Sequence, residues 1–228
     1  MPFWLTLLAV FPAFLLLFVI FVVFQTVLRL SQPGNGIHPV SREDFPEKYE
    51  TACELEGWAV NQGFEFCGGF RLDTGTPIFV AAWQKPGQSE YLLEYQAPHL
   101  THYDRVTIFA EDHALTTAST KDAQFLPQPI GSFVQSFPGL ELDELMERHE
   151  GGRKYLRGEY GLMPVFIDAK IDELVNQAIL RQMQYVRSIP FWAFRGPWWY
   201  FVNRETLKGQ PVEVLYPPSL RSELPKSA

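Results

Sequence analysis

The first 28 residues contain no charged side chain. This stretch includes Trp4 and the unbroken apolar run 15–24, and a helix needs about 20 such residues to cross the hydrocarbon of a bilayer. The chain also lacks the marks of a cleaved signal peptide, which are a basic start, a short apolar core and a small-residue cleavage site. We therefore expect a retained transmembrane helix over residues 1–29. Its expected membrane-spanning side chains include Leu5, Leu8, Phe14, Leu17, Val19, Phe21, Phe24 and Leu28.

No Lys or Arg precedes this apolar segment, whereas Arg29, Arg42 and Lys48 follow it. Positive residues flanking a span tend to stay on the cytoplasmic side. The carboxylates within 43–50 make the asymmetry small. We expect a single-pass membrane protein whose following domain lies in the cytoplasm.

The chain lacks an excess of positive charge, because its net charge is −7. That balance argues against nucleic acid as a partner. Cysteine is also scarce: Cys53 and Cys67 are the two in the sequence, too few for a disulfide scaffold. They could pair in an oxidising compartment or be two buried thiols, and the cytoplasmic orientation favours the thiols.

The chain divides into four predicted regions by composition and hydrophobic period. These are a transmembrane anchor (1–29), a Pro/Gly-rich linker (30–43), an α+β domain (44–218) and a flexible tail (219–228). Within the domain, the pattern predicts helices over about 44–63, from about 140 and over about 167–187. It predicts strands near 64–72, 77–84, 90–96, 104–110, 114–118 and 132–137.

The alternation within two predicted strands indicates the fold class. Both parities of 77–84 are apolar, which is typical of a central strand covered on both faces. In 90–96, Tyr91, Leu93 and Tyr95 alternate with a more polar set that includes Glu94. Short turns at 85–88 and 111–113 predict antiparallel neighbours. We predict an α+β domain, an antiparallel meander with helices packed on one face.

No motif for a cofactor, a phosphate or a nucleophilic triad is present, and we expect no cofactor. Asp73-Thr74-Gly75 resembles the active-site triplet of aspartic proteases, which needs two such carboxylates, but Asp and Gly are also ordinary hairpin residues. His99, His102 and His113 could supply metal ligands with nearby carboxylates. Their places in predicted loops and turns favour exposed residues over a metal site.

Residues 189–201 are the most unusual stretch, rich in Trp, Phe and Tyr. The segment could be a strand that completes the core. It could also lie at the membrane interface, which Trp and Tyr prefer, or bind a protein partner. The residues of this candidate patch are Phe191, Trp192, Arg195, Trp198, Trp199 and Tyr200.

These observations favour a non-catalytic domain that is tethered to the lipid bilayer and binds or scaffolds a protein partner. The alternative is a membrane-bound hydrolase that uses Asp73 or the region of His99, His102 and His113. Histidines and carboxylates that converge in one pocket would favour the enzyme.

The orientation is testable by fusing a reporter to either terminus. A C-terminal reporter that is active only in the cytoplasm should be active, and an N-terminal one should be silent, because the positive residues follow the span. The opposite pattern would place the domain outside the cytoplasm.

Overall fold

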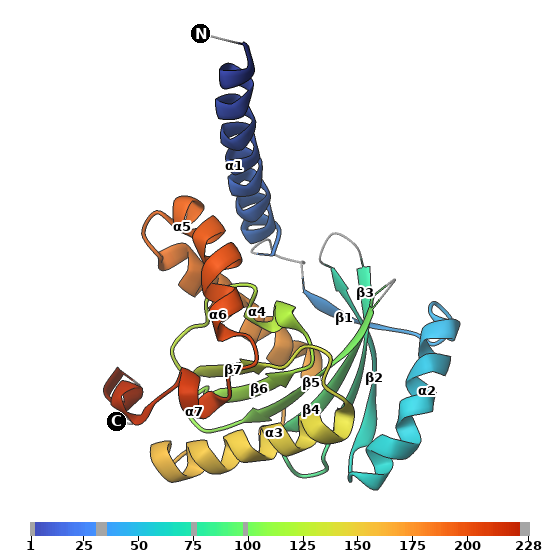
Figure 1. The fold of residues 1–228 in the computed structure, drawn as a ribbon. Helices are drawn as coiled ribbons and strands as arrows, with labels where there is room; N and C mark the ends of the chain where they lie inside the picture. Colours follow the sequence, from blue (N-terminus) through green and yellow to red (C-terminus); the bar gives the residue numbers. More distant parts are fainter. Residues whose placement is uncertain (1–2, 31–35, 74–76, 98–99, 224–228) are drawn as a thin grey trace.

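The computed structural model describes residues 3–30, 36–73, 77–97 and 100–223. Helix α1 (Phe3–Leu30) projects away from an α+β domain that contains all the strands (Figure 1). Its side chains from Val10 to Val22 are almost all exposed, for example Phe14 and Leu17 at 65% each. Between Val10 and Val22, these apolar side chains are therefore largely not packed against the rest of the described chain.

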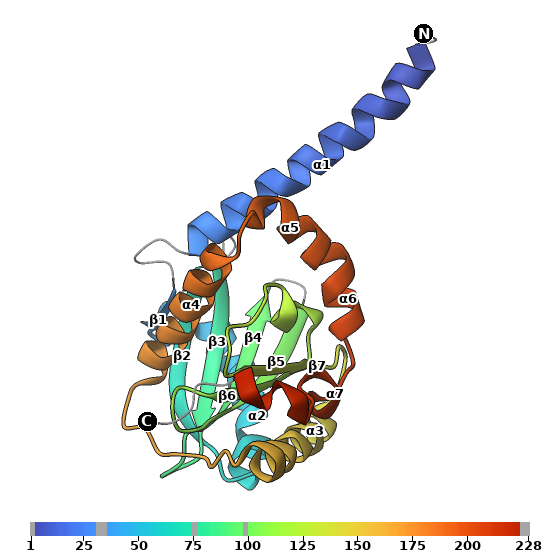
Figure 2. The same ribbon diagram turned by 90° about the vertical axis from the view of Figure 1, so that its left-hand side faces the viewer.

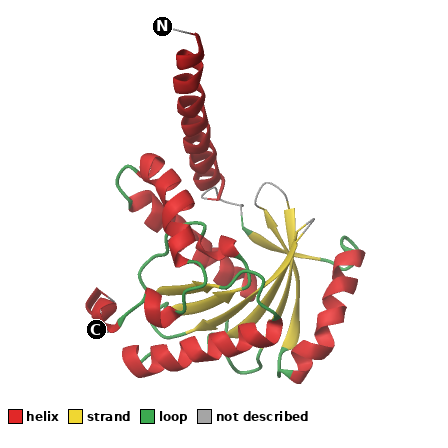
Figure 3. Ribbon diagram, in the orientation of Figure 1, coloured by secondary structure: helices red, strands yellow, loops and turns green. Residues whose placement is uncertain are grey.

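The domain is built on a seven-stranded sheet in which the strands follow one another in sequence order. Successive strands are antiparallel from β1 to β6, and β7 lies parallel to β6 (Figure 3). The strands are β1 (Ile37–Val40), β2 (Glu65–Asp73), β3 (Pro77–Gln84), β4 (Glu90–Ala97), β5 (Leu100–Ile108), β6 (Ala114–Ala118) and β7 (Ser132–Ser136). The predicted α+β class and the six predicted strands are confirmed.

The helices of the domain are α2 (Pro46–Asn61), α3 (Leu142–Tyr155), α4 (Ile171–Ser188), α5 (Trp192–Trp198), α6 (Arg204–Leu207) and α7 (Val212–Leu215). Helix α2 lies between β1 and β2 in the sequence, and the helices α3 to α7 follow the last strand. Short 3-10 or π-helical segments are η1 (Lys121–Gln124), η2 (Leu156–Tyr160), η3 (Trp199–Asn203) and η4 (Pro218–Glu223).

Helices cover both faces of the sheet, so the prediction of helices on one face is wrong. On one face, α2 and α3 pack against Phe79, Ala81 and Trp83. On the other, α4 packs against Val80 and Ala82. Figure 2 shows α4 on the side of the sheet opposite α2 and α3. Because both parities of β3 are buried and apolar, neither face could be left to water.

Strand β1 falls inside the region predicted to be a linker. Ile37 is 1% exposed and pairs with Leu72 of β2. The side-chain amide of Asn176 on α4 completes the strand: its Oδ1 accepts from Ile37 N at 2.8 Å, and its Nδ2 donates to Ile37 O at 3.0 Å. This partner lies 139 residues away, so the local Pro/Gly composition could not indicate it.

A buried ionic cluster joins the sheet to α3. The carboxylate of Glu90, 1% exposed, contacts Arg105 at 3.0 Å, Lys85 at 3.5 Å and Arg153 of α3. Arg105 also donates to the backbone oxygen of Met146 on α3 at 3.2 Å. A buried carboxylate is tolerable here because cations surround it.

His149 of α3 extends this contact with the sheet. Its ring nitrogens lie 2.8 Å from the hydroxyls of Thr107 and Thr117. Burial, and then the positive charges of Arg105, Arg153 and Lys85, hold the pKa of His149 well below its usual value. The imidazole is therefore neutral and serves as a bridge between α3 and two strands.

Replacing Glu90 with Ala should destabilise the domain by about 3–5 kcal/mol, because it leaves Arg105 buried without its counter-charge. Urea denaturation of the full chain in a non-ionic detergent measures this. Glu150→Ala is the matched control: that carboxylate pairs with the same Arg153 but is 42% exposed, so its loss should cost about 1 kcal/mol or less. Equal losses in the two variants would contradict the role of the buried cluster.

Candidate functional site

Asp73 lies at the end of β2, where it forms an ion pair with Arg71 (3.0 Å between Nε and Oδ1) and opposes Pro77 in the next strand. The rest of the triplet, Thr74 and Gly75, lies outside the described residues. The observed contacts are those of a residue that begins a hairpin connection. They offer no support for a protease site.

The histidines are spread over separate places. His99 lies outside the described residues. His102 stacks on Tyr95 near the start of β5, with ring centroids 4.7 Å apart. His113 is buried in the turn before β6, where its Nδ1 lies 2.9 Å from the oxygen of Ala110. Among the described residues, no group of three His, Cys, Asp or Glu side chains could hold a metal ion.

The aromatic segment 189–201 is helical, so its interpretation as a strand is wrong. Its inward residues complete the core: Trp192 packs with Met183 and Val186 of α4. Trp199 Nε1 donates to the oxygen of Gln124 at 3.3 Å. The ring of Tyr200 packs edge-on against Phe125, and the guanidinium of Arg204 lies 4.1 Å from the same ring's centroid. These contacts anchor the segment to the domain through one side.

The other side of this segment carries exposed aromatic residues. Phe191 is 79% exposed, Trp198 64% and Phe201 57%, and Arg195 is exposed beside them. Helix α5 contacts α1, and Figure 2 shows it next to the base of that helix. We call Phe191, Trp198 and Phe201 the aromatic rim. The structure thus places a sequence-predicted patch beside the apolar helix.

Cys53 and Cys67 are free thiols, and both are exposed, so the expectation that they are buried is wrong. Partial loss of water around the Cys67 sulfur, followed by the nearby charge of Glu65, raises the pKa of this thiol although its side chain is exposed. A raised pKa disfavours the reactive thiolate at neutral pH.

One cavity lies between α4 and the face of the sheet that α4 covers. Its volume is about 410 Å³, within the usual range of small-molecule sites. Apolar side chains such as Leu93, Val106, Leu174 and Val175 form much of its wall. We call it the α4 cavity.

Asp104 of β5 contributes a carboxyl group to this wall. Its Oδ1 is buried and has no hydrogen-bond partner, while the hydroxyl of Tyr95 donates to the carboxylate. Removal from water raises the pKa of Asp104 from 3.8 to about 7, and the hydrogen bond from Tyr95 opposes this only in part. The pKa of this carboxyl group therefore lies well above that of an exposed aspartate.

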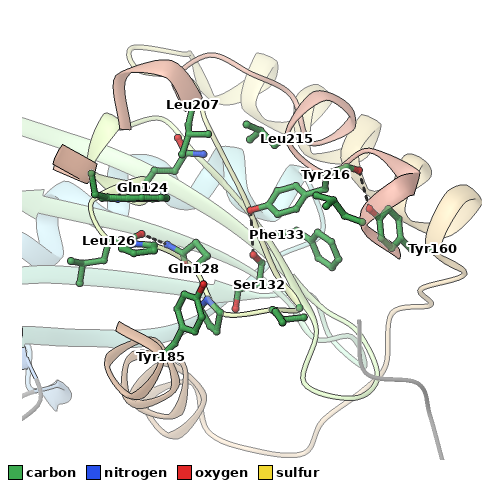
Figure 4. A pocket seen from close by; sticks show the side chains of 16 residues that line it. Gln124, Leu126, Gln128, Ser132, Phe133, Tyr160, Tyr185, Leu207, Leu215 and Tyr216 are labelled. Atoms are coloured by element: carbon green, nitrogen blue, oxygen red, sulfur yellow. Dashed lines mark hydrogen bonds between the residues drawn. The ribbon is translucent and has the colours of Figure 1, made fainter. Parts of the chain in front are cut away.

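A second cavity of about 310 Å³ adjoins the first, since Gln128 and Ser132 line both. It lies between the 124–133 segment and the C-terminal helices (Figure 4). Two of its three tyrosines have hydroxyl partners: Tyr216 OH lies 3.2 Å from Val134 N and 3.3 Å from Ser132 O, and Tyr160 OH donates to Pro217 O at 2.9 Å. Those hydroxyls hold the C-terminal segment against the sheet.

The strand pattern of the sequence indicates Asp104 as a buried polar residue, although Asp104 belongs to no motif. Asp104 has the same strand parity as Val106 and Ile108, and Tyr95 shares its parity with Tyr91 and Leu93. A carboxylate on an otherwise apolar strand face indicates a buried polar group. The register then brings Tyr95 and Asp104 together, because Tyr95 pairs with His102 and Leu93 with Asp104.

Comparison with protein-family models, with curated proteins and with solved structures found no match. Within the part of the chain that the structure describes, no helix is both long and apolar enough to cross a membrane.

The raised pKa of Asp104 makes stability depend on pH. Between about 4 and about 7 the folded state binds the proton and the unfolded state does not, so stability falls as the pH rises and then levels off. Over this whole pH range, the free energy of unfolding should fall by about 4 kcal/mol. Asp104→Asn should remove this slope in urea denaturation of the full chain between pH 4.5 and 8.

Glu173→Gln, at an exposed carboxylate on α4, serves as the control and should keep the slope. A slope that survives in Asp104→Asn would assign the pH dependence to another group.

Proposed function

We propose that this protein is a membrane-tethered binding domain, in which residues 1–29 anchor the chain in a bilayer and the α+β domain holds a ligand or partner beside it. The observation that carries the proposal is an apolar helix that stands clear of the domain. Phe14, Leu17 and Phe21 on α1 are each more than half exposed. Exposed apolar surface of this extent needs a covering other than water.

The charge pattern of the complete sequence supports the tether. Residues 1–28 include no charged side chain, and Arg29 follows them directly. On insertion scales each Leu, Ile, Phe or Val favours the membrane by about 0.3–0.6 kcal/mol. The positive residues after the span support a domain on the cytoplasmic side.

The aromatic rim supports a second, shallow contact with the same bilayer. Phe191, Trp198 and Phe201 are exposed on the segment that contacts α1. Trp is enriched at the headgroup level of membranes, and the exposed Arg195 suits anionic headgroups. The rim and the anchor would then fix the domain in one orientation.

The alternative of a hydrolase has no comparable support. Asp73 is engaged with Arg71, and His102 and His113 lie at opposite ends of the β5–β6 pair. A shared reaction centre needs these groups within hydrogen-bond reach of one substrate.

The tether is tested by placing charge in the span. Leu17→Lys together with Phe21→Lys should cost about 5–8 kcal/mol of insertion free energy. The full chain should resist alkaline carbonate extraction from membranes, whereas the double variant should be extracted. Met163→Lys with Phe166→Lys is the matched control, because those side chains are 51% and 58% exposed on the domain. Extraction of the unaltered chain would contradict the anchor.

The rim contact is tested by tryptophan quenching in proteoliposomes whose lipids carry bromine near the headgroup. Trp198→Phe should reduce the quenched emission, because the indole is expected at the interface. Trp58→Phe is the control, since Trp58 lies on α2 and donates to Asp143 of α3 at 3.0 Å. Equal quenching before and after Trp198→Phe would indicate that the aromatic rim does not contact the bilayer.

A further inference from the structure

We propose that the α4 cavity is a ligand site for a small amphipathic cation, in which an apolar body fills the cavity and an ammonium or similar donor pairs with Asp104. This inference goes beyond the tether and does not depend on it. It rests on the lining of one cavity and on an unpartnered buried atom.

The size and wall of the cavity fit an apolar body. A cavity of about 150 Å³ lined by aliphatic side chains can already hold benzene. The α4 cavity has about 410 Å³, and strand residues Leu93 and Val106 face helix residues Leu174 and Val175 across it. Such a wall favours carbon chains or rings over strongly hydrated molecules.

The charges of the lining favour a cation. Three charged residues line the cavity, Asp104, Asp112 and Arg181. Arg181 is paired with Asp112 through Nη1, which donates to the backbone oxygen at 2.8 Å and lies 3.6 Å from the side-chain Oδ2. Its Nε is buried without a hydrogen-bond partner, but the positive charge of Arg181 already has the Asp112 carboxylate beside it. Asp104 has no such cation, so its Oδ1 is a buried acceptor without a donor. A ligand that supplies an N–H donor would satisfy it.

The groups around Asp104 are consistent with this role. Tyr95 of β4 donates to its carboxylate, and His102 of β5 stacks on the Tyr95 ring. Strand β6 presents Ala118 opposite Asp104, and α4 contributes Arg181 to the same cavity. An arriving ammonium ion favours the ionised carboxylate, so binding should strengthen as the pH rises toward 8.

Three probes of nearly equal shape test the proposal: 2-phenylethylamine, 2-phenylethanol and phenylacetate. They are titrated into the full chain in non-ionic detergent, and binding is followed by the methyl NMR signals of Leu174, Val175 and Val106. We expect the amine to bind about tenfold more tightly than the alcohol, because a hydrogen bond from a charged donor is stronger than one from a neutral donor. Phenylacetate should bind most weakly.

Asp104→Asn should abolish the preference for the amine and leave the affinity for the alcohol nearly unchanged. Glu173→Gln removes the same charge from the exposed side of α4 and should keep the preference. Equal affinity for all three probes, absence of methyl shifts, or a preference that survives Asp104→Asn would each overturn the proposal.

A measurement on the unaltered chain covers the case in which Asp104→Asn fails to fold. Its affinity for the amine should rise about tenfold between pH 5.5 and pH 8, and its affinity for the alcohol should change little. An equal change in affinity for both probes would indicate a general loosening of the fold. It would contradict the proposal that Asp104 binds the amine.

Discussion

The burial of β3 on both faces is the constraint on which the rest of the domain depends. Val80, Ala81, Ala82 and Trp83 have no exposed surface, and they alternate between the two sides of the sheet. Two helical layers are therefore required. One is supplied by α2 and α3, and the other by α4, whose C-terminal end leads into the aromatic segment beside α1.

The buried polar groups on the two faces of the sheet differ in the number of partners that surround them. Under α3, Glu90 is surrounded by three cations, and His149 is held between two threonines. Under α4, Asp104 has one hydroxyl for a partner and a cavity beside it. The first arrangement pairs its carboxylate with cations of the chain, although Arg105 Nε and Arg153 Nε are buried there without a hydrogen-bond partner. In the second, Asp104 Oδ1 is a buried acceptor without a hydrogen-bond partner.

Local patterns in the sequence were enough to predict most strands and their hairpins. Alternation and turn residues are short-range signals, and the β3–β4 and β5–β6 connections lie where Lys85–Gln88 and Glu111–His113 placed them. The face of β4 that holds Glu94 was predicted to be more exposed to water. It is buried instead, because its polar residues find partners on distant elements, as Gln96 does with the backbone oxygen of Lys48.

The errors share one physical cause, which is dependence on partners far along the chain. Strand β1 exists because β2 and Asn176 complete its hydrogen bonds. The 189–201 segment has strand-like residues, yet the Phe125 and Gln124 contacts hold it as helix. Composition identified Phe191 and Trp198 of the aromatic rim, but the predicted patch did not include Phe201, and its residues Trp192, Trp199 and Tyr200 contact the domain. The position of Asp104 beside Tyr95 follows from the register of β4 and β5, which the local sequence does not indicate.

The short connection after α1 has a consequence for how molecules would reach the domain. Six residues separate Leu30 from Ile37, so the two residues lie at most about 25 Å apart. Helix α4, which covers the α4 cavity, also contacts α1. With α1 in a bilayer, a compound dissolved in lipid would arrive by lateral diffusion, in two dimensions. Its effective concentration at the domain would then be its level in water multiplied by its membrane partition coefficient.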